Sequence, residues 1–207
     1  MQKMTTFLGA VTLVLAFASL AVAGDLKPGD MAPEFTLTDQ NGKELSLKDY
    51  AGKTVVLEWV NPDCPFVQRH YKAKTMTTLS SKWAEKDVVW LAINSTHSTD
   101  VEDNLEFAKA EGLSYSILAD RSGEVGRAYH AKTTPHMFVI SGEGKIVYNG
   151  AIDDDSRGTS ESPTNFVDAA LTSCTMGASV ENAQTKPYGC SVKYSDKAEV
   201  RAKATSR

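Results

Sequence analysis

The chain has 207 residues, 42% of them hydrophobic, and its 22 basic and 26 acidic residues give a net charge of −4 at pH 7. No basic stripe runs along it, which argues against nucleic acid and anionic membrane surfaces as partners. A chain of this length can bury one sizeable core without disulfides. The sequence therefore favours a chemical role over a structural one for its three cysteines.

Residues 1–23 predict a signal peptide, because a basic residue is followed by an apolar core over 7–20 and a small-residue cleavage motif at 21–23. A transmembrane anchor is the weaker alternative, since the apolar core is short and has no stop-transfer flank. We therefore expect export to the periplasm or the extracellular space, a folded domain over 24–194 and a polar tail over 195–207.

Hydrophobic periodicity predicts strands that alternate with helices and then a closing hairpin and helix. The expected strands are 35–38, 44–47, 54–60, 88–93, 115–119, 134–140 and 145–152, with a tight turn at Asn41-Gly42. The expected helices are 65–85, a helix opened by a capping box of Thr99 and Glu102 and stopped at Gly112, 123–132, and one from an N-cap at Ser162 to Gly177. This order is typical of an α/β sandwich with a mixed sheet and helices on both faces.

Cys64 lies where the buried strand 54–60 meets the next helix. Pro65 suits the first helical position, which places Cys64 at the N-cap. Unpaired amides and the positive end of the helix dipole stabilise a thiolate there. The position favours a reactive cysteine of low pKa; the alternative is a structural cysteine in a loop.

Several motifs resemble the thioredoxin-like superfamily, in its redoxin (alkyl hydroperoxide reductase/thiol-specific antioxidant) branch and an exported peroxiredoxin-like subgroup. They are Pro28–Leu37, Tyr50–Leu57, Asn61–Pro65, Tyr148–Asp154 and Pro187–Lys193. The resemblance runs from about Leu26 to Tyr194 and implies a thioredoxin-like sandwich. It also implies a cis peptide bond before Pro135, with the preceding backbone facing the reactive sulfur; an ordinary trans proline is the alternative.

The chain departs from the families that it resembles at three positions. Val67 stands where thioredoxins carry the second cysteine of Cys-x-x-Cys. Asn61 stands where typical peroxiredoxins carry Thr or Ser, and Pro135 where they carry Arg. Asn61 flanks Cys64 and is expected to shape the site.

A second thiol is needed to resolve any intermediate on Cys64. Cys190, on a tail that contains Gly and Pro, is the better candidate, and an inert tail thiol is the alternative. Cys174 lies inside the last predicted helix and is expected to be a core residue.

The four histidines raise the question of a metal site. His136 adjoins Pro135, and a Cys-His pair is a fragment of a copper(I) or zinc site. The resembling copper metallochaperones use two loop cysteines, however, and this loop has one. We expect no metal and no other cofactor.

Three further features near Cys64 have ordinary structural interpretations. His70 falls on the apolar face of its helix and is expected in the core. Arg69 could steady a thiolate, but a basic side chain is expected to face solvent. The acidic run 153–155 is expected to form a solvated turn.

These observations predict an exported thiol-disulfide oxidoreductase in which Cys64 is the nucleophile and Cys190 resolves. The expected partners are a thiol or disulfide protein or a small thiol reductant. A thiol-dependent peroxidase acting on peroxide is one alternative. A redox-inert or metal-binding module with a thioredoxin fold is another.

Overall fold

The computed structural model describes residues 26–195, so the predicted signal peptide lies outside the described part. Its elements are β1 (Thr36–Asp39), β2 (Glu44–Ser46), η1 (Leu47–Tyr50), β3 (Val55–Trp59), α1 (Pro65–Lys72), α2 (Thr75–Ala84), β4 (Val89–Asn94), α3 (Val101–Glu111), β5 (Ser116–Ala119), α4 (Glu124–Ala128), β6 (Thr133–Thr134), β7 (His136–Ile140), β8 (Ile146–Gly150), α5 (Phe166–Thr175) and β9 (Cys190–Ser191). Across residues 26–195, no helix is long and apolar enough to cross a membrane.

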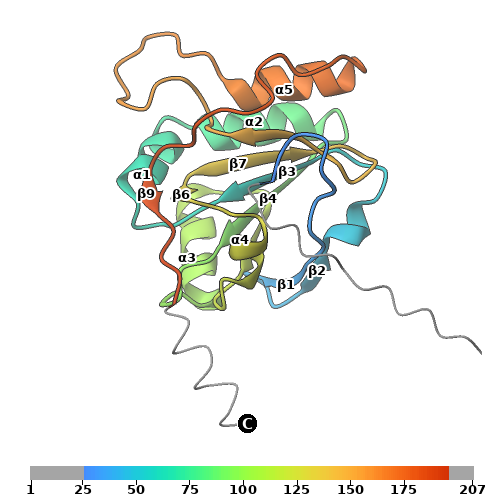
Figure 1. Ribbon diagram of the computed structural model, residues 1–207. Helices are drawn as coiled ribbons and strands as arrows, with labels where there is room; N and C mark the ends of the chain where they lie inside the picture. The colour runs from blue at the N-terminus through green and yellow to red at the C-terminus, as the bar shows by residue number, and fades with distance from the viewer. Residues whose placement is uncertain (1–25, 196–207) are drawn as a thin grey trace, which may run out of the picture.

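Seven strands form a mixed sheet in the order β2-β1-β5-β4-β3-β7-β8. β3, β4 and β5 are parallel, and the remaining pairs are antiparallel. Alternate residues of the central β3 face opposite cores, as expected for a pleated strand. Val56 and Val60 pack with residues of α1, α2 and α5, whereas Leu57 and Trp59 pack on the face that α4 helps to cover. This is the predicted α/β sandwich, and Figure 1 shows α2 and α5 together on one side of the sheet.

The predicted helix 65–85 is wrong in one respect, because the structure divides it into α1 and α2. Lys74 lies between them in the left-handed region, with φ of 56°. The break lets α2 turn so that Met76, Leu79 and Trp83 reach the core. Neither Gly nor Pro marks it in the sequence, so tertiary packing overrides the local pattern.

Two predicted helix starts are also corrected. Asn165, rather than Ser162, caps α5 by accepting a hydrogen bond from the Asp168 N–H at 2.8 Å. Asp100, rather than Thr99, caps α3 in a capping box with Asp103. The helix predicted over 123–132 is shorter, and the strand predicted over 134–140 is divided at Pro135.

A small second sheet brings the C-terminal segment to the end of β3. β9 pairs antiparallel with β6, and the register sets Thr133 opposite Ser191 and Thr134 opposite Cys190. Figure 1 shows this segment, in red, passing over β6 beside α1. The pairing decides where Cys190 lies relative to Cys64.

Candidate functional site

Cys64 is the N-cap residue of α1, with φ of −80° and ψ of 120°, and Pro65 occupies the first helical position. The side chain is buried, with 1% exposure. Its S–H group donates to the carbonyl oxygen of Thr134 at 2.9 Å. The predicted location of the cysteine at a strand-to-helix corner is therefore the one observed.

The Thr134–Pro135 peptide bond is cis, the geometry that the resemblance implies. Thr134 is buried, and its carbonyl faces the sulfur of Cys64. This carbonyl favours the protonated thiol, because it accepts the S–H proton.

Cys190 lies against Cys64. Its thiol and its N–H group both lower the pKa of Cys64, because they interact with the ionised sulfur. Gly189 makes the approach possible: its φ is +135°, and a Cβ atom built on it would lie 2.1 Å from the Thr134 oxygen. Cys64 and Cys190 are both free thiols in this structure.

The two thiols differ in acidity. Burial raises the pKa of Cys64, but interactions of the ionised sulfur with Cys190, with the Thr134 side chain and with the Val67 N–H together outweigh this, so the pKa lies below its usual value. Burial raises the pKa of Cys190 to about 11, and the neighbouring Cys64 adds to the rise. Cys64 therefore ionises first and is the better nucleophile and the better leaving group.

Asn61 shapes the loop that precedes Cys64. Its side-chain oxygen accepts from the Asp63 N–H at 2.9 Å, and its carbonyl accepts from the Cys64 N–H at 3.0 Å. Asn61 is buried, whereas Asp63 is exposed and does not cap α1 through its side chain.

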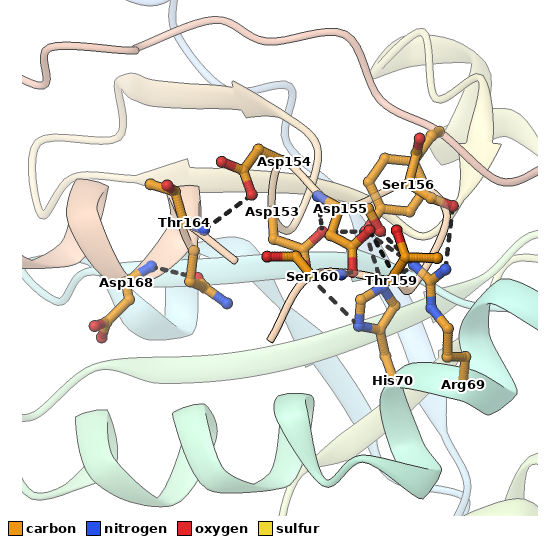
Figure 2. Close-up of polar contacts among 12 residues, drawn as sticks. Arg69, His70, Asp153, Asp154, Asp155, Ser156, Thr159, Ser160, Thr164 and Asp168 are labelled. Carbon is orange, nitrogen blue, oxygen red and sulfur yellow. Dashed lines mark hydrogen bonds and ion pairs between the residues drawn. The ribbon is translucent and has the colours of Figure 1, made fainter. Parts of the chain in front are cut away.

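The expectation that Arg69 faces solvent is wrong. The guanidinium donates to the carbonyl oxygens of Asp155, at 2.9 Å, and Ser156, at 3.1 Å. Figure 2 shows Arg69 and His70 reaching from α1 toward the 153–156 segment. His70 is buried, as predicted.

The acidic run is likewise not a simple solvated turn. Asp153 has only 5% exposure, and it accepts a hydrogen bond from the Tyr188 hydroxyl. Asp155 is half-buried and accepts from the N–H groups of Thr159 and Ser160. The prediction fails chiefly at Asp153, whose partners come from α1 and the C-terminal segment, whereas Asp154 is exposed as predicted.

Glu58 is a buried group to which sequence reasoning assigned no role. It is fully buried in β3 and accepts hydrogen bonds from the Tyr71 hydroxyl and the Trp90 indole, each at 3.0 Å. Burial raises its pKa to about 7. The available signal was a single charged residue in an otherwise apolar strand.

Cys174 and His136 have structural surroundings. Cys174 is half-buried in α5, packs against the core, and has a pKa raised by burial. His136 accepts from the Lys132 N–H at Nδ1 and pairs with the Asn149 side chain through Nε2. Within residues 26–195, no three His, Cys, Asp or Glu side chains are grouped to hold a metal ion.

The fold and the pair of unequal thiols define a thioredoxin-like, thiol-dependent oxidoreductase of redoxin type. The family model described as "AhpC/TSA family" matches residues 28–149, and the chain belongs to that family. The predicted redoxin branch is thus confirmed.

Individual relatives agree with this assignment. The chain is 29% identical to the thiol-disulfide oxidoreductase ResA of Bacillus cereus over 67% of this chain and 78% of that protein. An uncharacterised conserved protein from Geobacillus kaustophilus has a similar structure, with a TM-score of 0.76, 29% identity, and coverage of 83% of this chain and 94% of that one. The thioredoxin domain of a thiol-disulfide oxidoreductase from Bacteroides vulgatus, at 21% identity, shares the fold, with a TM-score of 0.54 and coverage of 60% and 89%.

Proposed function

We propose that this protein is an exported enzyme that exchanges electrons with disulfides, using Cys64 as nucleophile and Cys190 as resolving thiol. The observation that carries the proposal is the register of β9, which sets Cys190 opposite Thr134 while Thr134 accepts from the Cys64 thiol. The backbone of Thr134 and Pro135 faces the Cys64 sulfur, and the Asn61 side chain holds the loop that precedes Cys64.

The reaction proceeds by two thiol-disulfide exchanges. The Cys64 thiolate attacks one sulfur of a substrate disulfide, a mixed disulfide forms, and the other substrate thiolate leaves and takes up a proton. Cys190 then loses its proton and attacks the Cys64 sulfur, which releases the second substrate thiol. The substrate disulfide has then become two thiols, and Cys64 and Cys190 have become a disulfide. An external dithiol reduces the Cys64–Cys190 disulfide by the same exchanges.

The surroundings of Cys64 favour a disulfide over a peroxide as oxidant. Arg69 donates to the carbonyls of Asp155 and Ser156, and Asn61 uses its side chain within its own loop. Neither group is directed at a peroxide on Cys64, and positioned donors of this kind would polarise the O–O bond.

Mass spectrometry of the protein treated with a small disulfide tests the proposal. We expect a Cys64–Cys190 crosslink in the wild-type chain, a trapped mixed disulfide on Cys64 in Cys190→Ser, and no reaction in Cys64→Ser. Cys174→Ser is the matched control and should behave as wild type. Consumption of hydrogen peroxide at a rate matching disulfide reduction would favour the peroxidase instead.

Export is tested separately. Cell fractionation and intact mass should find a mature chain beginning near Gly24 outside the cytoplasm. A full-length chain retained in the cytoplasm would contradict this part of the proposal.

A further inference from the structure

Beyond the two thiols, and resting on the proposed function, we propose that Tyr188 is a positioning residue that holds Cys190 against Cys64. Its hydroxyl group is fixed by His70 and Asp153. We call the side chains of Tyr188, His70, Asp153 and Arg69 the Tyr188 latch.

The contacts of the latch meet at the Tyr188 hydroxyl. The Tyr188 hydroxyl donates to Asp153 Oδ1 and lies 3.0 Å from His70 Nε2. Because the hydroxyl has only one proton and gives it to Asp153, its contact with His70 is a hydrogen bond in the tautomer that carries a proton on Nε2. Arg69 Nη2 lies 3.4 Å from the same hydroxyl, and its guanidinium is 5.7 Å from the centre of the Tyr188 ring.

Burial makes these contacts specific. Asp153 and His70 are 5% and 4% exposed, and a buried carboxylate left without a donor is costly. Burial lowers the pKa of His70, although Asp153 opposes the change, so the imidazole is neutral near pH 7. Burial also raises the pKa of Tyr188, which keeps its hydroxyl a donor.

The latch joins the two thiols through one rigid element. Cys64 is the N-cap of α1, and Arg69 and His70 lie later in the same helix. Tyr188 lies two residues before Cys190, and the intervening Gly189 has no side chain to stiffen the backbone. Because Gly189 leaves this part of the backbone free, an anchor that holds Tyr188 on α1 restricts how far Cys190 can move from the start of that helix.

Other contacts hold the segment on the far side of Cys190. The Val192 N–H donates to the Lys132 carbonyl at 3.2 Å, and the Tyr194 hydroxyl donates to the Ala131 carbonyl at 2.8 Å. Tyr188 supplies the corresponding side-chain anchor before Cys190. A thiol anchored on both sides reacts with its neighbour at a high effective concentration.

The test compares Tyr188→Phe with Tyr129→Phe in the full mature chain. Tyr129 also donates a buried hydroxyl, to the Pro33 carbonyl, but it packs in the core on the other face of the sheet. Stopped-flow single turnover with a small disulfide separates attack by Cys64 from resolution by Cys190, and equilibration with dithiothreitol gives the effective concentration of the Cys64–Cys190 disulfide.

For Tyr188→Phe we expect resolution and effective concentration each to fall about tenfold, the loss of one hydrogen bond to a charged acceptor. Attack by Cys64 should fall less than resolution, because a displaced Cys190 lowers the pKa of Cys64 less. Tyr129→Phe should change neither quantity. Hydrogen exchange of the 188–192 amides should be faster in Tyr188→Phe alone.

Unchanged resolution, an equal fall in both steps, or the same effect in Tyr129→Phe would overturn the inference while leaving the proposed function standing. A wild-type chain that forms no Cys64–Cys190 disulfide would overturn both.

Discussion

Cys64 and Gly189 lie against the same atom, the carbonyl oxygen of Thr134. The Cys64 thiol donates to this oxygen at 2.9 Å, and a Cβ atom on Gly189 would come within 2.1 Å of it. The backbone that faces the reactive sulfur is thus covered by the chain's own C-terminal segment, and only glycine permits so close an approach.

Replacing Gly189 with Ala should separate β9 from β6. The added Cβ would collide with the Thr134 carbonyl and would also strain a backbone with φ of +135°. We expect the Cys64–Cys190 disulfide to form about a hundredfold more slowly, the order expected for an ångström-scale misplacement. Quenched-flow alkylation followed by mass spectrometry measures the rate.

Gly177→Ala is the matched control, because Gly177 also has positive φ, at +66°, but has nothing within 4 Å of an added Cβ. It should cost about 1 kcal/mol in stability and leave disulfide formation unchanged. Equal slowing in both variants would show that general destabilisation, and not the contact with Thr134, is responsible.

The reactivity of Cys64 should depend on Cys190 even before any disulfide forms. Burial raises the pKa of Cys64, and the interaction of its sulfur with the Cys190 thiol opposes this rise. In Cys190→Ala the pKa of Cys64 should therefore rise relative to wild type. The pH dependence of iodoacetamide labelling, read at Cys64 by peptide mass spectrometry, gives the pKa in each variant.

Cys174→Ala controls for the loss of a thiol and should leave the Cys64 titration unchanged. A Cys64 pKa equal to that of a free cysteine in the wild-type protein would count against the reactive site as a whole.

Glu58 should make the protein less stable as the pH rises. Its pKa is raised by burial from 4.5 to about 7 in the folded state, so the folded protein holds a proton that the unfolded chain has released. This contribution is fully present below pH 4.5 and is lost as the pH rises through 7, and it amounts to on the order of 3 kcal/mol. Urea unfolding at pH 5 and pH 8 measures it.

Glu58→Gln removes the titrating group, and its free energy of unfolding should change less between these pH values than that of wild type. The comparison uses the change with pH rather than the absolute stability, because the amide places a donor NH2 where one of the two carboxyl oxygens accepts from Tyr71 or Trp90. If the free energy of unfolding changed with pH equally in both proteins, the titrating group would not be Glu58.

Lys74→Gly should stabilise the protein. Lys74 is exposed and has left-handed backbone angles between α1 and α2, a conformation that costs an ordinary residue about 1 kcal/mol and glycine very little. Part of this gain is offset by the greater freedom of glycine in the unfolded chain. We expect the urea midpoint to rise.

Lys72→Gly, at the last residue of α1, should lower the midpoint by part of the cost of glycine in a helix interior, which is about 1 kcal/mol. If both substitutions destabilise equally, the chain continues as one helix through Lys74.

Local chemistry was enough to predict much of the molecule from its sequence. Pro65 after an apolar strand predicted Cys64 at the N-cap of a helix, and Asn41-Gly42 predicted the β1–β2 hairpin, which the structure contains. The apolar run over 54–60 predicted a buried strand, which the structure contains as β3, and the alternation of strands with helices predicted the mixed sheet. These features depend on residues close together in the chain, whose preferences act before any long-range contact forms.

Only the tertiary structure decided the rest. The register of Cys190 on Thr134, the burial of Asp153 beneath Tyr188 and the turn at Lys74 depend on segments far apart in sequence, whose approach is set by packing over the whole sheet. Asp153 looks solvated in its run of carboxylates until a tyrosine and a histidine from other elements cover it, because burial is a property of the assembled chain and not of the residue.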